Sequence, residues 1–298
     1  MGKEKFLIIN ADDFGMCRAH NIATEELLLS GGVTGATVMA PCPYAKEAAE
    51  FAAAHPELAV GVHLTTTSEW QSYRWGAVAD GVPSLLGEDG CFYRRSADFA
   101  ARAVSSEVET ELISQIERLS SWGLIPSHFD NHMGSLYGIT NADFTLLRLA
   151  IDIAARYRVP FRFPSKISAD TFTNGTLNVQ IPEKEVMAVF ENMLLYLHKC
   201  GVATVDYLRP GDFDAGKMTF SDFREYTFEL FRSLEDGITE TYIHPAVECD
   251  EIKTITPNWR RRVWEYELFG DPKTGDFIRS LGITTITYRD LPRLVGLN

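Results

Sequence analysis

Several side chains that can bind a metal or move a proton stand at the ends of short apolar runs. Asp12 and Asp13 follow an apolar run near the N-terminus, and His63 lies near the end of another. His132 and His244 occupy similar positions in two later runs. One Asp and two His, with coordination positions left open, form a recurring catalytic metal arrangement. The pattern therefore predicts a metal or acid/base site, provided that these runs are strands whose carboxyl ends meet.

The two adjacent carboxylates allow a division of labour. Neighbouring side chains in a strand point to opposite sides, but a turn at the strand end lets both Asp12 and Asp13 reach one site. One could bind a metal while the other takes a proton from an attacking water. Each feature also has a plainer interpretation: the Asp pair can form a turn or cap a helix, and His63 or His132 can be a core histidine. Together the positions favour a functional site, because burying several ionisable groups is costly.

The elements that position these residues alternate along the chain. Eight short runs rich in β-branched and aromatic residues are predicted strands covered on both faces: 6–10, 35–40, 59–64, 127–132, 161–163, 203–208, 240–244 and 284–288. Longer amphipathic segments lie between them, which predicts an α/β fold with a closed or nearly closed parallel barrel. An open doubly wound sheet is the competing topology, although the dinucleotide pattern G-x-G-x-x-G is absent. Nothing divides the chain, so we expect residues 1–298 to form a single domain.

One stretch, at about 65–105, has no clear period and interrupts this alternation as an insertion. It contains the aromatic residues Trp70, Tyr73, Trp75, Phe92 and Tyr93 among Gly and Pro. Long irregular segments in compact domains are usually functional. The aromatic side chains could stack on a sugar ring or pack as a lid, and the sequence leaves both open.

Composition excludes several classes of partner. The 298 residues contain 28 Lys and Arg against 41 Asp and Glu, a net charge of −13. This charge disfavours nucleic acid and anionic membrane surfaces, and no apolar run approaches membrane-spanning length. The odd number of cysteines, 5, and the absence of a signal-peptide core predict a cytoplasmic location. A homodimer remains open.

These motifs together resemble the YdjC-like carbohydrate deacetylases, a family that includes the chitooligosaccharide deacetylases. The resemblance covers residues 6 to about 245 and is most specific in the N-terminal Asn-Ala-Asp-Asp-Phe-Gly. The matching segments are 7–15, 61–64, 128–132, 209–211 and 243–245. It implies an irregular TIM-like (β/α) barrel and a hydrolase that removes an N-acetyl group from an acetylated amino sugar or a short chitooligosaccharide.

The resemblance also implies roles for individual residues. It implies one divalent metal ion, Mg²⁺ or Zn²⁺, held by Asp13, His63 and His132. Asp12 is the implied general base, and His244 is the candidate acid that protonates the leaving amine.

Further residues would support this site. Arg209 and Asp130 are implied to orient its groups, and His128 is the alternative to Asp12 as base or to His244 as acid. The family often continues the fourth motif with more histidines, where this chain has Gly134 and Leu136. The implied ligand set stays complete, but the identity of the sugar is left open.

Two other functions remain in view. A metal-dependent sugar isomerase or lyase on a similar barrel would use a lysine for proton abstraction, and Lys166 follows the fifth predicted strand. A non-catalytic sugar-binding regulator could keep the barrel, but binding alone does not require the adjacent carboxylates Asp12 and Asp13.

Overall fold

The computed structural model describes residues 4–138, 143–166, 183–211, 216 and 218–297. The strands are β1 (Lys5–Phe14), β2 (Gly35–Val38), β3 (Val60–Leu64), β4 (Phe129–Asn131), β5 (Tyr207–Leu208), β6 (Gly237–Ile243) and β7 (Ile283–Thr285). The α-helices are α1 (Arg18–Ser30), α2 (Ala45–Ala54), α3 (Ser96–Ala100), α4 (Ser105–Ser121), α5 (Thr145–Tyr157), α6 (Glu183–Cys200), α7 (Phe220–Arg232), α8 (Asp250–Ile255), α9 (Trp259–Gly270), α10 (Pro272–Ser280) and α11 (Leu291–Leu294). Short 3₁₀ turns are η1 (Pro83–Leu85), η2 (His132–Gly134) and η3 (Tyr288–Asp290).

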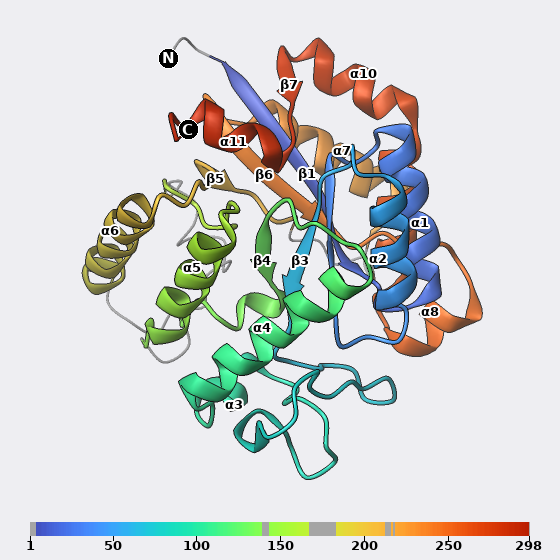
Figure 1. The fold of residues 1–298 in the computed structure, drawn as a ribbon. Coiled ribbons are helices and arrows are strands. Elements are labelled where there is room, and N and C mark those ends of the chain that lie inside the picture. The colour runs from blue at the N-terminus through green and yellow to red at the C-terminus, as the bar shows by residue number, and fades with distance from the viewer. Residues whose placement is uncertain (1–3, 139–142, 167–182, 212–215, 217, 298) are drawn as a thin grey trace.

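A curled parallel sheet forms the centre of the molecule (Figure 1). Its strand order is β4-β3-β2-β1-β6-β5, and β7 also pairs with β1. β1 pairs with β6 along most of its length, and on its other side with β7 near its start and β2 near its end. This central strand is buried from Leu7 to Phe14, as its apolar sequence predicts for a strand covered on both faces.

The expected α/β class is confirmed, but the sheet does not close into a regular barrel. The predicted strand 161–163 forms only an isolated bridge, from Phe161 to Phe129 of β4. A second isolated bridge joins Pro164 to Val205. Between β4 and β5 the described residues therefore make single contacts rather than a ladder, and the sheet is a half-barrel. The short apolar run Phe-Arg-Phe carries too few residues to support continuous pairing.

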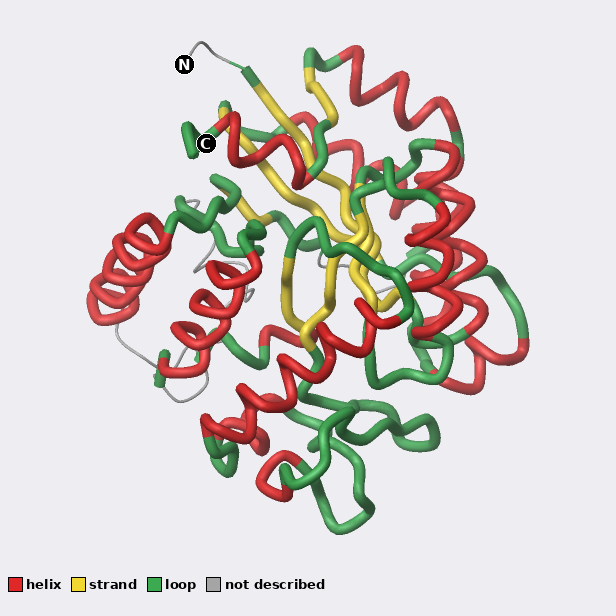
Figure 2. Tube along the Cα trace, viewed as in Figure 1, coloured by secondary structure: helices red, strands yellow, loops and turns green. Residues whose placement is uncertain are grey.

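Amphipathic helices cover the sheet (Figure 2). In α4 the predicted apolar face is fully buried, at Val108, Leu112, Ile116 and Leu119. α1 packs against α9, and α4 packs against α5. None of the described helices is both long and apolar enough to cross a membrane.

The polar residues lie at one end of this sheet. Figure 1 shows β3 pointing toward the irregular segment that connects it to α4. Parallel strands place their carboxyl ends at the same edge, and this segment, drawn mainly as loop in Figure 2, lies at that end. The fold therefore brings together strand-end side chains that are far apart in the sequence.

Candidate active site

Two acidic side chains leave the end of β1 through an unusual turn. Asp13 has a left-handed backbone with φ 64°, which is uncommon outside glycine. Gly15 follows with φ 89°, and a Cβ there would approach the Ala45 backbone to 2.8 Å. The turn brings Asp13 to the same histidine, His63, that Asp12 also approaches. Both carboxylates are buried.

His63 is held in one orientation by the neighbouring strand. It pairs in register with Asp130 of β4, and its Nδ1 donates to Asp130 Oδ1 at 2.6 Å. Thr37 of β2 donates to the other oxygen of Asp130 at 2.9 Å. Burial alone lowers the pKa of His63, but the carboxylates around it, above all Asp130, raise that pKa to about 9. The imidazole Nε2 is left facing Asp13 Oδ1 at 3.6 Å.

His132 approaches from the turn η2 that follows β4. Its Nδ1 is hydrogen-bonded to Thr67 Oγ1 at 3.0 Å, and the edge of Trp75 packs against its ring at 6.0 Å between centroids. The turn contains Met133 with φ 54°, a strained conformation of the kind that clusters at functional sites. His132 Nε2 lies 3.9 Å from Asp13 Oδ1.

Asp13, His63 and His132 form a donor set that suits a cation. Asp13 Oδ1 is buried and has no hydrogen-bond partner, and it faces both Nε2 atoms. Two ligand atoms that each lie roughly 2.1 Å from one metal ion are roughly 3.0–3.4 Å from each other. The distances from Asp13 Oδ1 to Nε2 of His63 and of His132, 3.6 and 3.9 Å, are close to this range. Each imidazole uses its Nδ1 for an orienting hydrogen bond, as metal-bound histidines do.

A second group of donors lies beside the first. Ligand atoms of Asp12, His63 and Asp130 come within 4.8 Å of one another. The Arg162 guanidinium, however, contacts both Asp12 oxygens at 2.7 Å and Asp130 at 2.9 Å. A cation among these carboxylates would lie next to a buried positive charge. Asp13 differs in one respect: Arg262 of α9 holds only its Oδ2 atom, and its Oδ1 has no hydrogen-bond partner, whereas Arg162 contacts both Asp12 oxygens.

Comparison with known proteins shows the family to which the chain belongs. The family model described as YdjC-like protein matches residues 6–280. The chain belongs to the YdjC-like family. A carbohydrate deacetylase of Geobacillus stearothermophilus is 30% identical over 97% of this chain and 99% of its own length. One from Enterococcus faecalis is 32% identical over 96% and 98%.

A similar structure and a partial match extend this comparison. A solved Enterococcus faecalis V583 protein, described as a candidate for cellobiose-phosphate cleavage, has a TM-score of 0.74 and 26% identity. The alignment covers 97% of this chain and 99% of that one. A chitooligosaccharide deacetylase of Yersinia pestis is 35% identical, but over only 43% of this chain and 49% of its own length.

Arg162 is the main residue of this YdjC-like site that the sequence did not reveal. It is 3% exposed and also contacts Glu240 of β6 at 2.7 Å. Tyr288 donates a hydrogen bond to the other Glu240 oxygen. The Arg162 guanidinium thus binds three buried carboxylates, one each from β1, β4 and β6. Its only signal in the sequence is one charged residue between Phe161 and Phe163.

Arg262 of α9 is a second unforeseen partner. It donates to Asp13 Oδ2 at 3.1 Å and contacts His20 Nε2 at 2.9 Å. Burial tends to raise the pKa of Asp13, but nearby positive groups, first His244 and then Arg262, hold it well below its usual range. Asp13 is therefore a carboxylate, with one oxygen held by Arg262 and the other free for a ligand. His20 is fully buried.

His244 reaches the same end of the sheet, one residue beyond β6. It is half-buried, and its backbone N–H donates to Glu265 at 2.8 Å. Its ring packs edge-on against Tyr242. Burial lowers the pKa of His244, and the charge of Asp13 partly offsets this effect. His244 is therefore near enough to Asp13 for their charges to interact.

His128 and Arg209 have partners outside the donor set. His128 is fully buried, stacked on Tyr288 at 3.8 Å and hydrogen-bonded to Ser127, and burial lowers its pKa to about 3. It is a neutral core histidine below Asp130. Arg209 follows β5 and pairs with Glu235. Arg162 contacts Asp12 and Asp130, and Asp130 is hydrogen-bonded to His63; the orienting roles of Arg209 and Asp130 stay predictions.

Most of the aromatic segment is packed. Trp75 and Phe92 are buried, while Trp70 and Tyr73 are partly exposed. The Trp75 indole donates to Thr67 O at 2.8 Å, so this ring supports the loop that orients His132. The Arg262 guanidinium lies over the Trp70 ring, 5.6 Å from its centroid, so this aromatic side chain borders the group that holds Asp13.

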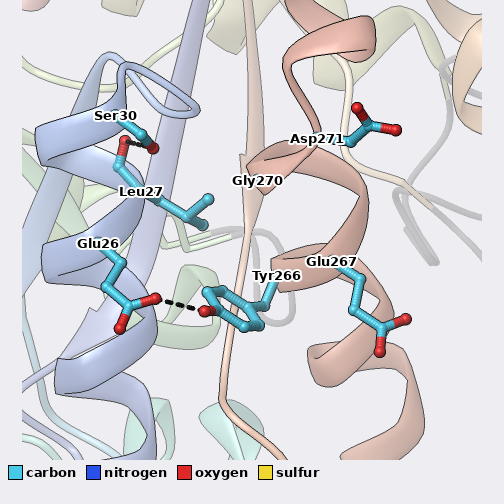
Figure 3. A pocket seen from close by; sticks show the side chains of 7 residues that line it. All are labelled: Glu26, Leu27, Ser30, Tyr266, Glu267, Gly270 and Asp271. Atoms are coloured by element: carbon cyan, nitrogen blue, oxygen red, sulfur yellow. Dashed lines mark hydrogen bonds between the residues drawn. The ribbon is translucent and has the colours of Figure 1, made fainter.

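A surface pocket elsewhere does not coincide with the cluster. Figure 3 shows a hollow of about 380 Å³ between α1 and α9. Its lining includes Glu26, Leu27, Ser30, Tyr266, Glu267, Gly270 and Asp271. The α1 residues come from the second half of that helix, whereas the site residues precede its first turn. The carboxylates and the serine of this lining therefore belong to a different part of the surface from the strand-end groups.

Proposed function

We propose that this protein is a metal-dependent hydrolase that removes an N-acetyl group from an acetylated amino sugar or a short chitooligosaccharide. The observation that carries the proposal is Asp13 Oδ1, buried without a partner and facing the free nitrogens of His63 and His132. The relatives named carbohydrate deacetylase, aligned over nearly the whole chain, support the substrate class.

Asp13, His63 and His132 would hold one divalent ion, Mg²⁺ or Zn²⁺. Such an ion polarises a carbonyl and lowers the pKa of water when bound. Asp12 would take the proton of the attacking water. Arg162 binds both of its oxygens and Asn10 Nδ2 also donates to Oδ1 at 2.9 Å, so the second lone pair of Oδ2 would serve this purpose. Arg162 would thus position Asp12 as the base.

His244 would give its proton to the leaving amine. It follows β6 directly, at the end of the sheet that carries Asp13, and its charge interacts with that of Asp13. Its lowered pKa makes the protonated ring a stronger acid, which suits transfer to an amine. The partly exposed Trp70 offers one aromatic face near the site, where a sugar ring could stack.

The structure gives less support to the isomerase or lyase alternative. Lys166 pairs with Asp206 at 3.0 Å and helps line a different pocket, together with Glu4 at the opposite end of β1. It therefore lies away from the strand-end cluster and could not take a proton from a substrate there. A non-catalytic binder would need neither Asp12 nor its arginine clamp.

The test combines elemental analysis with acetate release from a panel of N-acetylglucosamine oligomers. We expect His63→Ala to lose both bound metal and turnover. Asp12→Asn should keep the metal but lose roughly 10²–10⁴-fold in kcat. His198→Ala is the matched control, because His198 is exposed on α6 and should change neither measurement.

Three results would contradict the proposal. Acetate release by a verified metal-free His63→Ala preparation would remove the metal from the reaction. Near-normal turnover of Asp12→Asn would remove the assigned base. Binding of acetylated sugars by the wild-type protein without acetate release would favour the non-catalytic alternative.

A further inference from the structure

One carboxylate oxygen of the irregular segment makes no hydrogen bond with any described residue. Glu69 follows the buried stretch Thr65–Ser68 and has a side-chain exposure of 17%. Its Oε2 atom is buried and accepts no hydrogen bond from any described residue. A buried carboxylate oxygen without a donor is costly, so its position calls for a positive partner.

The atom that Glu69 faces is already part of the site. Its Oε2 lies 3.4 Å from His132 Nε2, the same nitrogen that faces Asp13 Oδ1 at 3.9 Å. Two unpartnered carboxylate oxygens thus converge on one imidazole nitrogen. Thr67, two residues before Glu69, orients that ring through Nδ1. The segment that fixes the His132 ring therefore also delivers the second carboxylate.

The separations match a shared ion better than direct contacts. A distance of 3.4 Å is long for a hydrogen bond between an imidazole and a carboxylate. It is within about half an ångström of the roughly 3.0 Å expected between neighbouring ligands of an octahedral ion, which keeps positions for water beside four protein ligands. The three distances to the unpartnered oxygens, 3.4, 3.6 and 3.9 Å, are of one size.

We propose that Glu69 is a fourth protein ligand of the cation held by Asp13, His63 and His132. This inference rests on the function proposed above. With Glu69, the ligand set contains two carboxylates, Asp13 and Glu69. Their two negative charges balance the charge of a divalent ion. Carboxylate oxygen also favours hard ions such as Mg²⁺ and Mn²⁺ over softer ones. The irregular segment thus helps to select the metal.

Mn²⁺ titration of the chelator-treated protein tests this inference without any assay of activity. Electron paramagnetic resonance measures free Mn²⁺ and gives its Kd directly. We expect Glu69→Gln to raise this Kd at least about tenfold and to weaken Zn²⁺ binding less. Glu88→Gln is the matched control, because Glu88 is exposed on the same segment. His63→Ala serves as the variant that loses the site, and circular dichroism checks that each variant is folded.

The outcomes separate this inference from the proposed function. Unchanged Mn²⁺ affinity in Glu69→Gln, together with loss of binding in His63→Ala, would refute the role of Glu69 and leave the metal site intact. An increase in KM for the sugar without a change in metal affinity would likewise refute it, since Glu69 would then bind substrate. Failure of the wild-type protein to bind Mn²⁺ or Zn²⁺ would overturn both proposals.

Discussion

Replacing Arg162 with methionine should destabilise the protein strongly. Its guanidinium is 3% exposed and contacts Asp12, Asp130 and Glu240 at 2.7–2.9 Å. Removing one partner of a buried ion pair costs about 3–5 kcal/mol, because the remaining charge is left uncompensated. For a chain of 298 residues this corresponds to a decrease in Tm of about 5–8 °C.

The loss of stability in Arg162→Met should depend on pH in a definite direction. Burial raises the pKa of Asp130, but Arg162, followed by His63, lowers it below its usual range. In the wild type, the stabilisation that Asp130 gains from these partners is present above the ordinary pKa of an Asp side chain. It is lost as the pH falls through the lowered pKa of Asp130. Without Arg162 the carboxylates can accept protons more readily. The loss of stability in Arg162→Met should therefore be larger at about pH 8 than at about pH 5.

Differential scanning calorimetry at several pH values measures both effects. Arg232→Met is the matched control, since Arg232 is 39% exposed and pairs with Glu225 and Glu229 on the surface. Exposed pairs contribute at most about 1 kcal/mol. A Tm for Arg162→Met within about 2 °C of the wild type, or a difference that grows as the pH is lowered, would refute this account of the buried cluster.

Three further changes test separate parts of the structure. Burial raises the pKa of Glu240 to about 7 from 4.5, so its contribution to stability is present below about pH 4.5 and is lost as the pH rises through 7. Denaturant titrations should show that the free energy of unfolding falls by about 3 kcal/mol over this pH range. Glu240→Gln should abolish this fall. A variant with the same pH profile as the wild type would contradict the assignment to Glu240. Thr67→Val removes the hydrogen bond to His132 Nδ1 and should weaken metal affinity roughly 10–100-fold in a Mn²⁺ titration, and wild-type affinity would count against it. Gly61→Ala places a Cβ 2.3 Å from the His128 carbonyl oxygen. It should lower the free energy of unfolding by about 1–3 kcal/mol or more, measured as a lower Tm. An unchanged Tm would show that β3 can move away from the His128 backbone at no cost.

Local sequence pattern was sufficient for much of the fold and part of the site. Apolar runs predicted the buried parallel strands, because a strand covered on both faces has no polar side to display. The same pattern predicted that Asp13 and His63 would meet, since parallel strands end at one edge. The half-barrel was not foreseen, because the run 161–163 has the composition of a strand but makes only one bridge.

The sequence could not identify the charged partners. Arg262 follows two other arginines and is typical of a solvated helix face, yet its guanidinium binds Asp13. Glu69 lies in a segment without period. Histidines 128 and 132 stand four residues apart, but only the fold shows that His128 is in the core.

Residue type and spacing therefore determined which side chains of this protein could do chemistry and at which end of the sheet they lie. The tertiary structure decided which of them touch. A buried charge must be compensated by whatever element is within a few ångströms, and the compensating residue can come from any distance along the chain. For Asp12 that residue is Arg162, which is 150 positions away.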